Sequence, residues 1–121
     1  MDIAIVGATG NVGRKTLEVL QQKNLNIDNL YLVASPNSAG KQLEFNGKKY
    51  SIENLETYDF SKAKITFFAA GGKISEQYAE KAAKHTTVID NSSYFRMDPD
   101  VPLIVPQVNA KDIQNMKKNI I

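Results

Sequence analysis

The first twenty residues contain three glycines at three-residue intervals, directly after a run of apolar residues. Ile3 to Val6 is typical of a buried parallel strand, and Asn11 to Lys23 carries apolar residues near helical spacing. Between the two lies the turn Gly7-x-x-Gly10-x-x-Gly13. A strand, a glycine turn and a helix in this order predict one unit of a parallel sheet with its helix packed on a face.

Each glycine of this turn has a physical role in a dinucleotide-binding unit. Gly7 permits a tight turn, Gly10 lets the backbone approach a pyrophosphate, and Gly13 lets the helix pack against the strand. The phosphate would meet free N–H groups at the positive end of the helix dipole, with Thr9 and Asn11 as side-chain donors. The alternative is a strand-to-helix turn in which the glycines serve packing alone.

The remaining chain continues the alternation of strands and helices. Strands are predicted at 30–35, 65–70 and 87–90, and a helix at 75–84. Asn46-Gly47 predicts a hairpin, and Asn109 is expected to cap a final helix through about Lys118. The predicted fold class is therefore α/β, with a Rossmann-like, mostly parallel sheet and flanking helices. We expect one dinucleotide-binding domain over residues 1–121.

The loop after the second predicted strand indicates which dinucleotide is bound. NAD-binding domains usually place Asp or Glu there, where it accepts a hydrogen bond from the ribose 2′-hydroxyl. Here the segment reads "ASPNSAGK", which has no acid but contains Ser35, Asn37, Ser38 and the cation Lys41. These donors would accept a 2′-phosphate, so the sequence predicts NADP in preference to NAD. The same residues also suit an ordinary polar turn.

Two further segments follow predicted strands, and ligands of open α/β sheets bind beyond such strand ends. The pair Gly71-Gly72 would let a ring or phosphate come close, or would simply turn the chain into the next helix. Arg96 is one of only two arginines. Its planar fork binds carboxylate or phosphate through two hydrogen bonds, and the polar residues 91–93 add donors. A surface salt bridge is the alternative for Arg96.

Composition excludes several other classes of protein. The 121 residues contain no cysteine and one histidine, so disulfides, thiolate chemistry and multi-histidine metal sites are excluded within them. A net charge of +2, without runs of like charge, gives little support for nucleic-acid binding. The apolar runs are too short to span a bilayer and no signal sequence is evident, so we expect a cytoplasmic protein.

Four segments together resemble the N-terminal cofactor domain of aspartate-semialdehyde dehydrogenase. They read "IAIVGATGNVG", "ASPNSAGK", "FFAAGG" and "DNSSYFRMDPDVPLIVPQVN", and the last is the most specific. The resemblance implies NADPH-dependent reduction of β-aspartyl phosphate to aspartate semialdehyde, with release of phosphate. That reaction lies on the path to lysine, methionine and threonine. The family is commonly dimeric, which implies a homodimer for the full-length protein.

The resemblance also implies roles for individual residues. Arg96 would bind the phosphate of the substrate, and Asn37 stands where the family often has arginine. The implied cofactor contacts are Thr9, Gly10, Asn11 and Val12 for the pyrophosphate, Ser38 to Gly40 for the adenosine 2′-phosphate, and Gly72 near the nicotinamide.

The catalytic residues implied by the resemblance lie outside this chain. The nucleophile would be a cysteine beyond Ile121, and the base a histidine in a C-terminal catalytic and dimerisation domain. The ending "KKNII" looks like the start of another strand, so we expect the chain to be part of a longer protein. The chain alone is therefore predicted to be inactive, with no catalytic residue and no metal site.

Two other functions remain open at this point. N-acetyl-γ-glutamyl-phosphate reductase performs the same chemistry on another acyl phosphate. Atypical short-chain dehydrogenases and NADP-sensing regulators also often begin "GATGNVG", and such dehydrogenases use a Tyr-x-x-x-Lys pair. Tyr58 and Lys62 have that spacing. We interpret the match as chance, because the pair precedes the predicted strand at 65–70, whereas the catalytic pair belongs on a late helix.

Overall fold

The structure is a computed structural model of the chain and describes residues 1–23, 25–104 and 110–121. In these residues, six strands form one sheet flanked by two α-helices, which confirms the predicted α/β class with a mostly parallel sheet. The strands are β1 (Asp2–Val6), β2 (Asn29–Ala34), β3 (Gln42–Phe45), β4 (Lys48–Asn54), β5 (Ile65–Phe68) and β6 (Thr87–Asp90). The helices are α1 (Asn11–Gln22) and α2 (Gly72–Ala83), with 3-10 segments η1 (Phe60–Lys62) and η2 (Ala110–Asn115).

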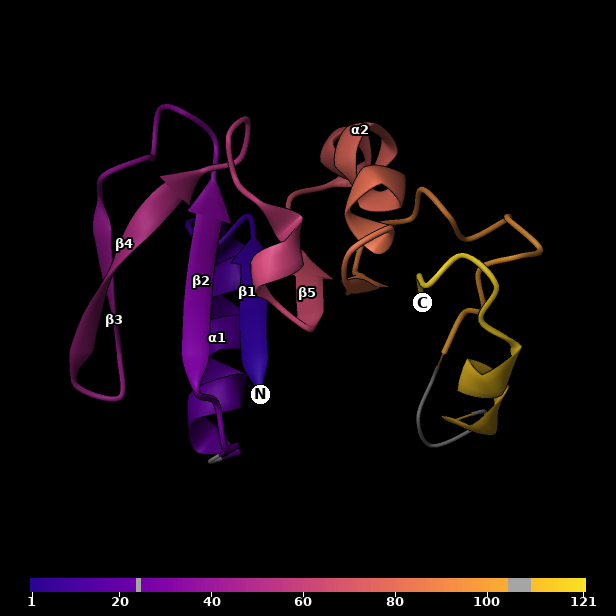
Figure 1. Cartoon of the computed structure of the whole chain (residues 1–121), viewed down its shortest axis with the longest axis horizontal. Coiled ribbons are helices and arrows are strands. Elements are labelled where there is room, and N and C mark those ends of the chain that lie inside the picture. Colours follow the sequence, from indigo (N-terminus) through magenta and orange to yellow (C-terminus); the bar gives the residue numbers. More distant parts are fainter. Residues whose placement is uncertain (24, 105–109) are drawn as a thin grey trace.

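The order of the strands places a topological switch at β1. The sheet runs β3-β4-β2-β1-β5-β6, and every neighbouring pair is parallel except β3 with β4. The chain leaves β1 toward β2 and later returns to β1's other side as β5 (Figure 1). In open α/β sheets a ligand binds at such a switch, beyond the carboxyl ends of the strands.

The two helices cover opposite faces of the sheet. Side chains alternate between faces along a strand, so Ile3 and Ile5 of β1 face one way and Ala4 and Val6 the other. Leu17 and Leu20 of α1 share a buried cluster with the first pair, and Ala79 and Ala82 of α2 share one with the second. The amphipathic pattern of each helix thus determines the layer to which it belongs.

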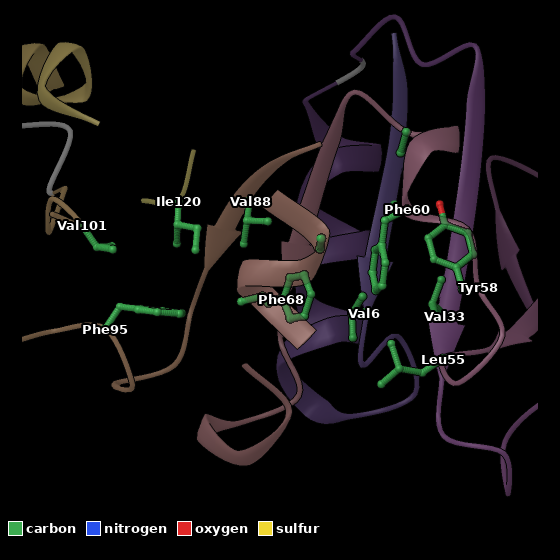
Figure 2. Close-up of a cluster of buried hydrophobic side chains, with 14 residues drawn as sticks. Val6, Val33, Leu55, Tyr58, Phe60, Phe68, Val88, Phe95, Val101 and Ile120 are labelled. Atoms are coloured by element: carbon green, nitrogen blue, oxygen red, sulfur yellow. The ribbon is translucent and has the colours of Figure 1, made fainter. Parts of the chain in front are cut away.

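The core on the α2 side continues past β6 to the irregular segment 91–102. Figure 2 shows the cluster running from Tyr58 and Phe60, past Phe68 and Val88, to Ile120, Phe95 and Val101. Phe95 is 5% exposed and Val101 7%. This segment has no regular secondary structure, yet two apolar anchors attach it to the sheet.

The Asn-Gly hairpin is confirmed. Asn46 and Gly47 join β3 to β4 with φ of 51° and 77°. Positive φ at both central residues matches the twist of the strands that such a turn connects. The hairpin extends the parallel sheet through the pairing of β4 with β2.

The predicted start of the second helix was wrong by three residues. Helix α2 begins at Gly72 rather than at Ser75, because Gly71 takes the left-handed φ of 89° and turns the chain directly into the helix. Ser75 is consequently a fully buried residue within the first turns. Two glycines have poor helix propensity, which is why the sequence indicated a turn over both.

The final helix predicted from Asn109 to about Lys118 was also wrong in extent. Asn109 lies outside the described residues, and residues 110–121 form a 3-10 segment, η2, and no α-helix. Asn119 then has φ of 60°, and Ile120 forms a parallel bridge with Val88 of β6. The residues after η2 turn to run beside the sheet, and that turn is incompatible with a longer helix. The strand start read from "KKNII" is confirmed as this bridge.

Candidate functional site

The carboxyl edge of the parallel strands brings together all four segments that the sequence singled out. The glycine turn follows β1, the serine-rich loop follows β2, the glycine pair follows β5, and the segment containing Arg96 follows β6. A groove of about 790 Å³ runs along α1 from Asn11 and Val12 at its start, and its lining also includes Ala69 after β5 and Asn91 after β6. This volume lies in the range of small-molecule sites.

The three glycines of the first turn differ in what surrounds them. A Cβ on Gly7 would lie 2.7 Å from the carbonyl oxygen of Ala69, and one on Gly13 only 2.0 Å from that of Gly7. Gly7 also has φ of 88°. A Cβ on Gly10 would meet only the Gly7 oxygen, at an ordinary 3.5 Å. The fold therefore requires glycine at two positions, while at Gly10 the space is left open toward solvent.

Helix α1 begins in a way that favours an anion. Gly10 is its N-cap residue in extended conformation, no side chain caps the helix, and its first turn contains no acidic residue. The first N–H groups of a helix have no partner within it and lie at the positive end of the helix dipole. Backbone donors without a competing carboxylate are what a pyrophosphate needs.

The loop after β2 lies against the glycine turn. The hydroxyls of Thr9 and Ser38 are 3.5 Å apart, so the two loops meet. Within the loop, the Ser38 N–H donates to the Ser35 carbonyl at 2.9 Å, and Gly40 has φ of 87°. Asn37 is exposed. Turn geometry therefore aligns these polar groups beside the first turn, and residues 35–41 include no carboxylate.

The glycine pair opens the second helix beside β1. Gly71 is the N-cap residue of α2 and Gly72 its first helical residue, and a Cβ on either would meet no atom within 4 Å. The first turn of α2 also lacks acidic residues. The sequence analysis named the pair and assigned the cofactor contact to Gly72, whereas the residue whose positive φ requires glycine is Gly71.

Asp90 begins the segment that carries Arg96, and the sequence analysis gave it no role of its own. It ends β6, and its Oδ1 accepts hydrogen bonds from the Ser75 hydroxyl at 2.8 Å and from the Ser92 N–H at 2.9 Å. Its Oδ2 accepts from the Ser92 hydroxyl at 2.9 Å. The available signal was the Asp-x-Ser spacing at a strand end, which is typical of a local side-chain turn.

Arg96 lies on this segment with an exposed side chain. Among the described residues its guanidinium forms no ion pair. It lines a small hollow of about 30 Å³ together with Asp90 and Ser92. Beyond Arg96, Lys118 donates to Asp98 at 2.8 Å, and this hydrogen bond lowers the pKa of the Asp98 carboxyl.

The Tyr58 and Lys62 pair does not form a catalytic site. Tyr58 is buried, its hydroxyl has no hydrogen-bond partner among the described residues, and burial raises the pKa of that hydroxyl. Lys62 lies 3.8 Å from Glu53. A catalytic tyrosine needs an accessible hydroxyl with a lowered pKa, so the interpretation of this spacing as chance agrees with the geometry.

The doubly wound sheet, the switch at β1 and the uncapped helix after three glycines define a dinucleotide-binding domain of the Rossmann class. Comparison with protein families gives a match to "Semialdehyde dehydrogenase, NAD binding domain" over residues 2–116. The chain belongs to this family. In the described residues, no helix is long and apolar enough to cross a membrane.

Several similar proteins are named aspartate-semialdehyde dehydrogenase. An aspartate-semialdehyde dehydrogenase of Aquifex aeolicus is 51% identical over 118 residues, which are 96% of this chain and 35% of that protein. Aspartate-semialdehyde dehydrogenase 2 of Vibrio cholerae is 47% identical, and the match covers 99% of this chain and 36% of that protein. The crystal structure of aspartate semialdehyde dehydrogenase II from Vibrio cholerae, complexed with ASA, superposes with a TM-score of 0.96 over 99% of this chain and 40% of that one. The chain thus spans little more than a third of these relatives.

Proposed function

We propose that this chain is the N-terminal, NADP-binding part of an aspartate-semialdehyde dehydrogenase. The full-length protein would reduce β-aspartyl phosphate to aspartate semialdehyde with NADPH and release phosphate. The observation that carries the proposal is Arg96, whose guanidinium has no ion-pair partner among the described residues and lies on the same sheet edge as the glycine turn. The named relatives favour this function over N-acetyl-γ-glutamyl-phosphate reductase.

The residues of the first turn fit a dinucleotide. The space in front of Gly10 is open, and uncapped N–H groups of α1 point to that side, so a pyrophosphate would find donors without displacing a side chain. Ser35, Asn37 and Ser38 would donate to the 2′-phosphate, and Gly72 would lie near the nicotinamide. NADPH, when bound, supplies the hydride.

The chain's own residues would bind and orient the two reactants. Arg96 would neutralise the phosphate of the acyl phosphate and hold it in place through two charged hydrogen bonds. Because the chain contains no cysteine, the nucleophile would come from the remainder of the longer protein. That remainder would also supply most of a homodimer contact, and the assembled enzyme would be cytoplasmic.

Turnover by the full-length protein tests this function. We expect it to reduce NADP⁺ when aspartate semialdehyde and phosphate are both present, followed at the absorbance of NADPH. Residues 1–121 alone should give no turnover, because the reaction needs a thiolate that they lack. Turnover by residues 1–121, or none by the full-length protein, would contradict the proposal.

Cofactor preference gives a second test. We expect NADPH to bind the full-length protein at least about tenfold more tightly than NADH, because one or two hydrogen bonds to a charged phosphate contribute about 1.5–3 kcal/mol each. Calorimetric titration with both cofactors measures this ratio. Ser38→Ala should lower the affinity for NADPH but not that for NADH, and so reduce the ratio. Equal affinities for the two cofactors in the unmodified protein would refute the role of the serine-rich loop.

A further inference from the structure

We propose that Asp90 is the positioning residue that orients the segment containing Arg96 for anion binding. The inference rests on the proposed function, since it takes Arg96 as the group that contacts phosphate. Asp90 lies at the end of β6 and is tied to both Ser75 of α2 and Ser92 of the segment. Neither the motifs nor the resemblance assign this carboxylate a role.

The carboxylate connects three elements through three hydrogen bonds. Both of its oxygens accept, from the Ser75 hydroxyl, the Ser92 N–H and the Ser92 hydroxyl, at 2.8 to 2.9 Å. Ser75 is fully buried inside α2, so Asp90 is fixed on a rigid helix and a rigid strand at once. An anionic acceptor suits this place, because all three partners donate.

The connection continues from Ser92 to Arg96. The Ser92 hydroxyl oxygen also accepts the Tyr94 N–H at 3.2 Å, and the Arg96 N–H donates to the Ser93 carbonyl at 3.1 Å. These bonds fix the direction in which the backbone leaves β6. Arg96 and Asp90 line the same small hollow, so a shift of the carboxylate's partners changes the surroundings of the guanidinium directly.

The apolar anchors and the attachments beyond Arg96 do not set the direction of the turn at Ser92. Phe95 and Val101 are held by apolar packing, which is non-directional. The hydrogen bond between Lys118 and Asp98 lies beyond Arg96 along the chain. On the side from which the chain enters the segment, the Asn91 N–H donates to the Phe68 carbonyl at 2.9 Å and holds the first peptide. The hydrogen bonds to Asp90 hold the turn at Ser92 that follows.

The chain contains a matched control for this motif. Asp59 stands two residues before Ser61, and its Oδ1 accepts from the Ser61 N–H at 2.9 Å and from the Ser61 hydroxyl at 2.6 Å. These hydrogen bonds lower the pKa of the Asp59 carboxyl. The turn caps η1 ahead of β5, away from the carboxyl edge. Asp59→Asn therefore makes the same chemical change at the same local turn without touching the segment of Arg96.

The experiment is steady-state kinetics of Asp90→Asn in the full-length protein, with phosphate and NADP⁺ varied in turn. An amide cannot accept from all three donors, so we expect the KM for phosphate to rise on the order of tenfold, the effect of about one lost hydrogen bond. The KM for NADP⁺ should change less than about twofold, because Asp90 has no hydrogen bond to the first glycine turn or the serine-rich loop, and substitutions away from such contacts usually change free energies by about 0.5 kcal/mol or less. Asp59→Asn should leave both unchanged.

Two substitutions at Ser92 give an independent measure if Asp90→Asn does not fold. Ser92→Ala removes the hydroxyl that links Asp90 to Tyr94, and should raise the KM for phosphate in the same way. Ser92→Thr keeps the hydroxyl, so its KM for phosphate should stay close to that of the unmodified protein. A rise of equal size in both KM values, or no rescue by threonine, would make Asp90 an ordinary structural residue and overturn the proposal.

Hydrogen exchange separates this inference from the proposed function. In Asp90→Asn, the amides of Ser92 and Tyr94 should exchange on the order of tenfold faster, because local opening becomes easier when a hydrogen bond is lost. If the unmodified protein shows no phosphate-dependent turnover, the proposed function fails while faster exchange still supports the placement of the segment by Asp90. Unchanged exchange at both amides overturns the placement itself.

Discussion

Replacing Arg96 by alanine in the full-length protein will lower kcat/KM for the phosphate-bearing substrate by roughly 30- to 1000-fold. The loss of two charged hydrogen bonds, at about 1.5–3 kcal/mol each and with incomplete additivity, amounts to about 2–4 kcal/mol. At about 1.4 kcal/mol per tenfold change, this gives the stated range. Arg96 is exposed and unpaired in the described residues, so its removal should not disturb the core.

Lysine at position 96 provides the graded comparison. Arg96→Lys keeps the charge but loses the planar fork, so it should retain only part of the activity. The KM values for phosphate and β-aspartyl phosphate should rise in both variants, and that for NADPH should stay nearly constant. A rise confined to the KM for NADPH would indicate that Arg96 contacts the cofactor. No change in any kinetic constant would support the alternative, in which Arg96 is a surface residue that only forms a salt bridge.

The second large effect is expected at Gly10. Gly10→Val should weaken NADPH binding by at least about 100-fold, because the side chain would fill the space in which a pyrophosphate approaches the N–H groups of α1. Losing two or more hydrogen bonds to a charged group, at about 1.5 kcal/mol or more each, has this size. The extended backbone of Gly10, with φ of −78°, accepts a β-branched residue without strain.

Gly13→Ala is the control for that experiment. A Cβ there would lie 2.0 Å from the carbonyl oxygen of Gly7, which is backbone and cannot move aside. We expect this smaller substitution to destabilise the protein by ~3 kcal/mol or more, whereas Gly10→Val should leave the unfolding midpoint nearly unchanged. Urea denaturation measures both. If Gly10→Val unfolds the domain, the role of Gly10 is packing rather than binding.

Most of the fold could be predicted because its signals are local. Buried parallel strands appear as short apolar runs, and the Asn46-Gly47 turn requires positive φ at two residues that tolerate it. Right-handed crossovers determine the face on which each connecting helix packs, but the order of the strands came only from the structure. The end of the chain was harder, since the path after η2 depends on the contact between Ile120 and Val88, and no local pattern records it.

The site shows the same division between local and distant causes. The glycine turn, the serine-rich loop and Arg96 could be named because residue type alone suggests their chemistry. Asp90 and Ser75 are 15 positions apart and on different elements. Only the tertiary structure brings them together. For the pair Gly71-Gly72, the sequence does not indicate which glycine takes the positive φ, because both tolerate it, and the structure shows that it is Gly71.

The contact between Gly7 and Ala69 has a consequence for the order of events as the protein folds. The Ala69 N–H donates to the Val6 carbonyl at 2.8 Å, and the Ala69 oxygen lies where a side chain on Gly7 would be. The turn after β1 is therefore completed by residues about sixty positions later in the chain, and long loops close late in folding. A nascent chain in which only β1, α1 and β2 have been synthesised contains all three glycines of the turn. Its cofactor site is still incomplete, because Ala69 has not yet packed against the turn. Cofactor would stabilise the assembled sheet and give little help to its first half.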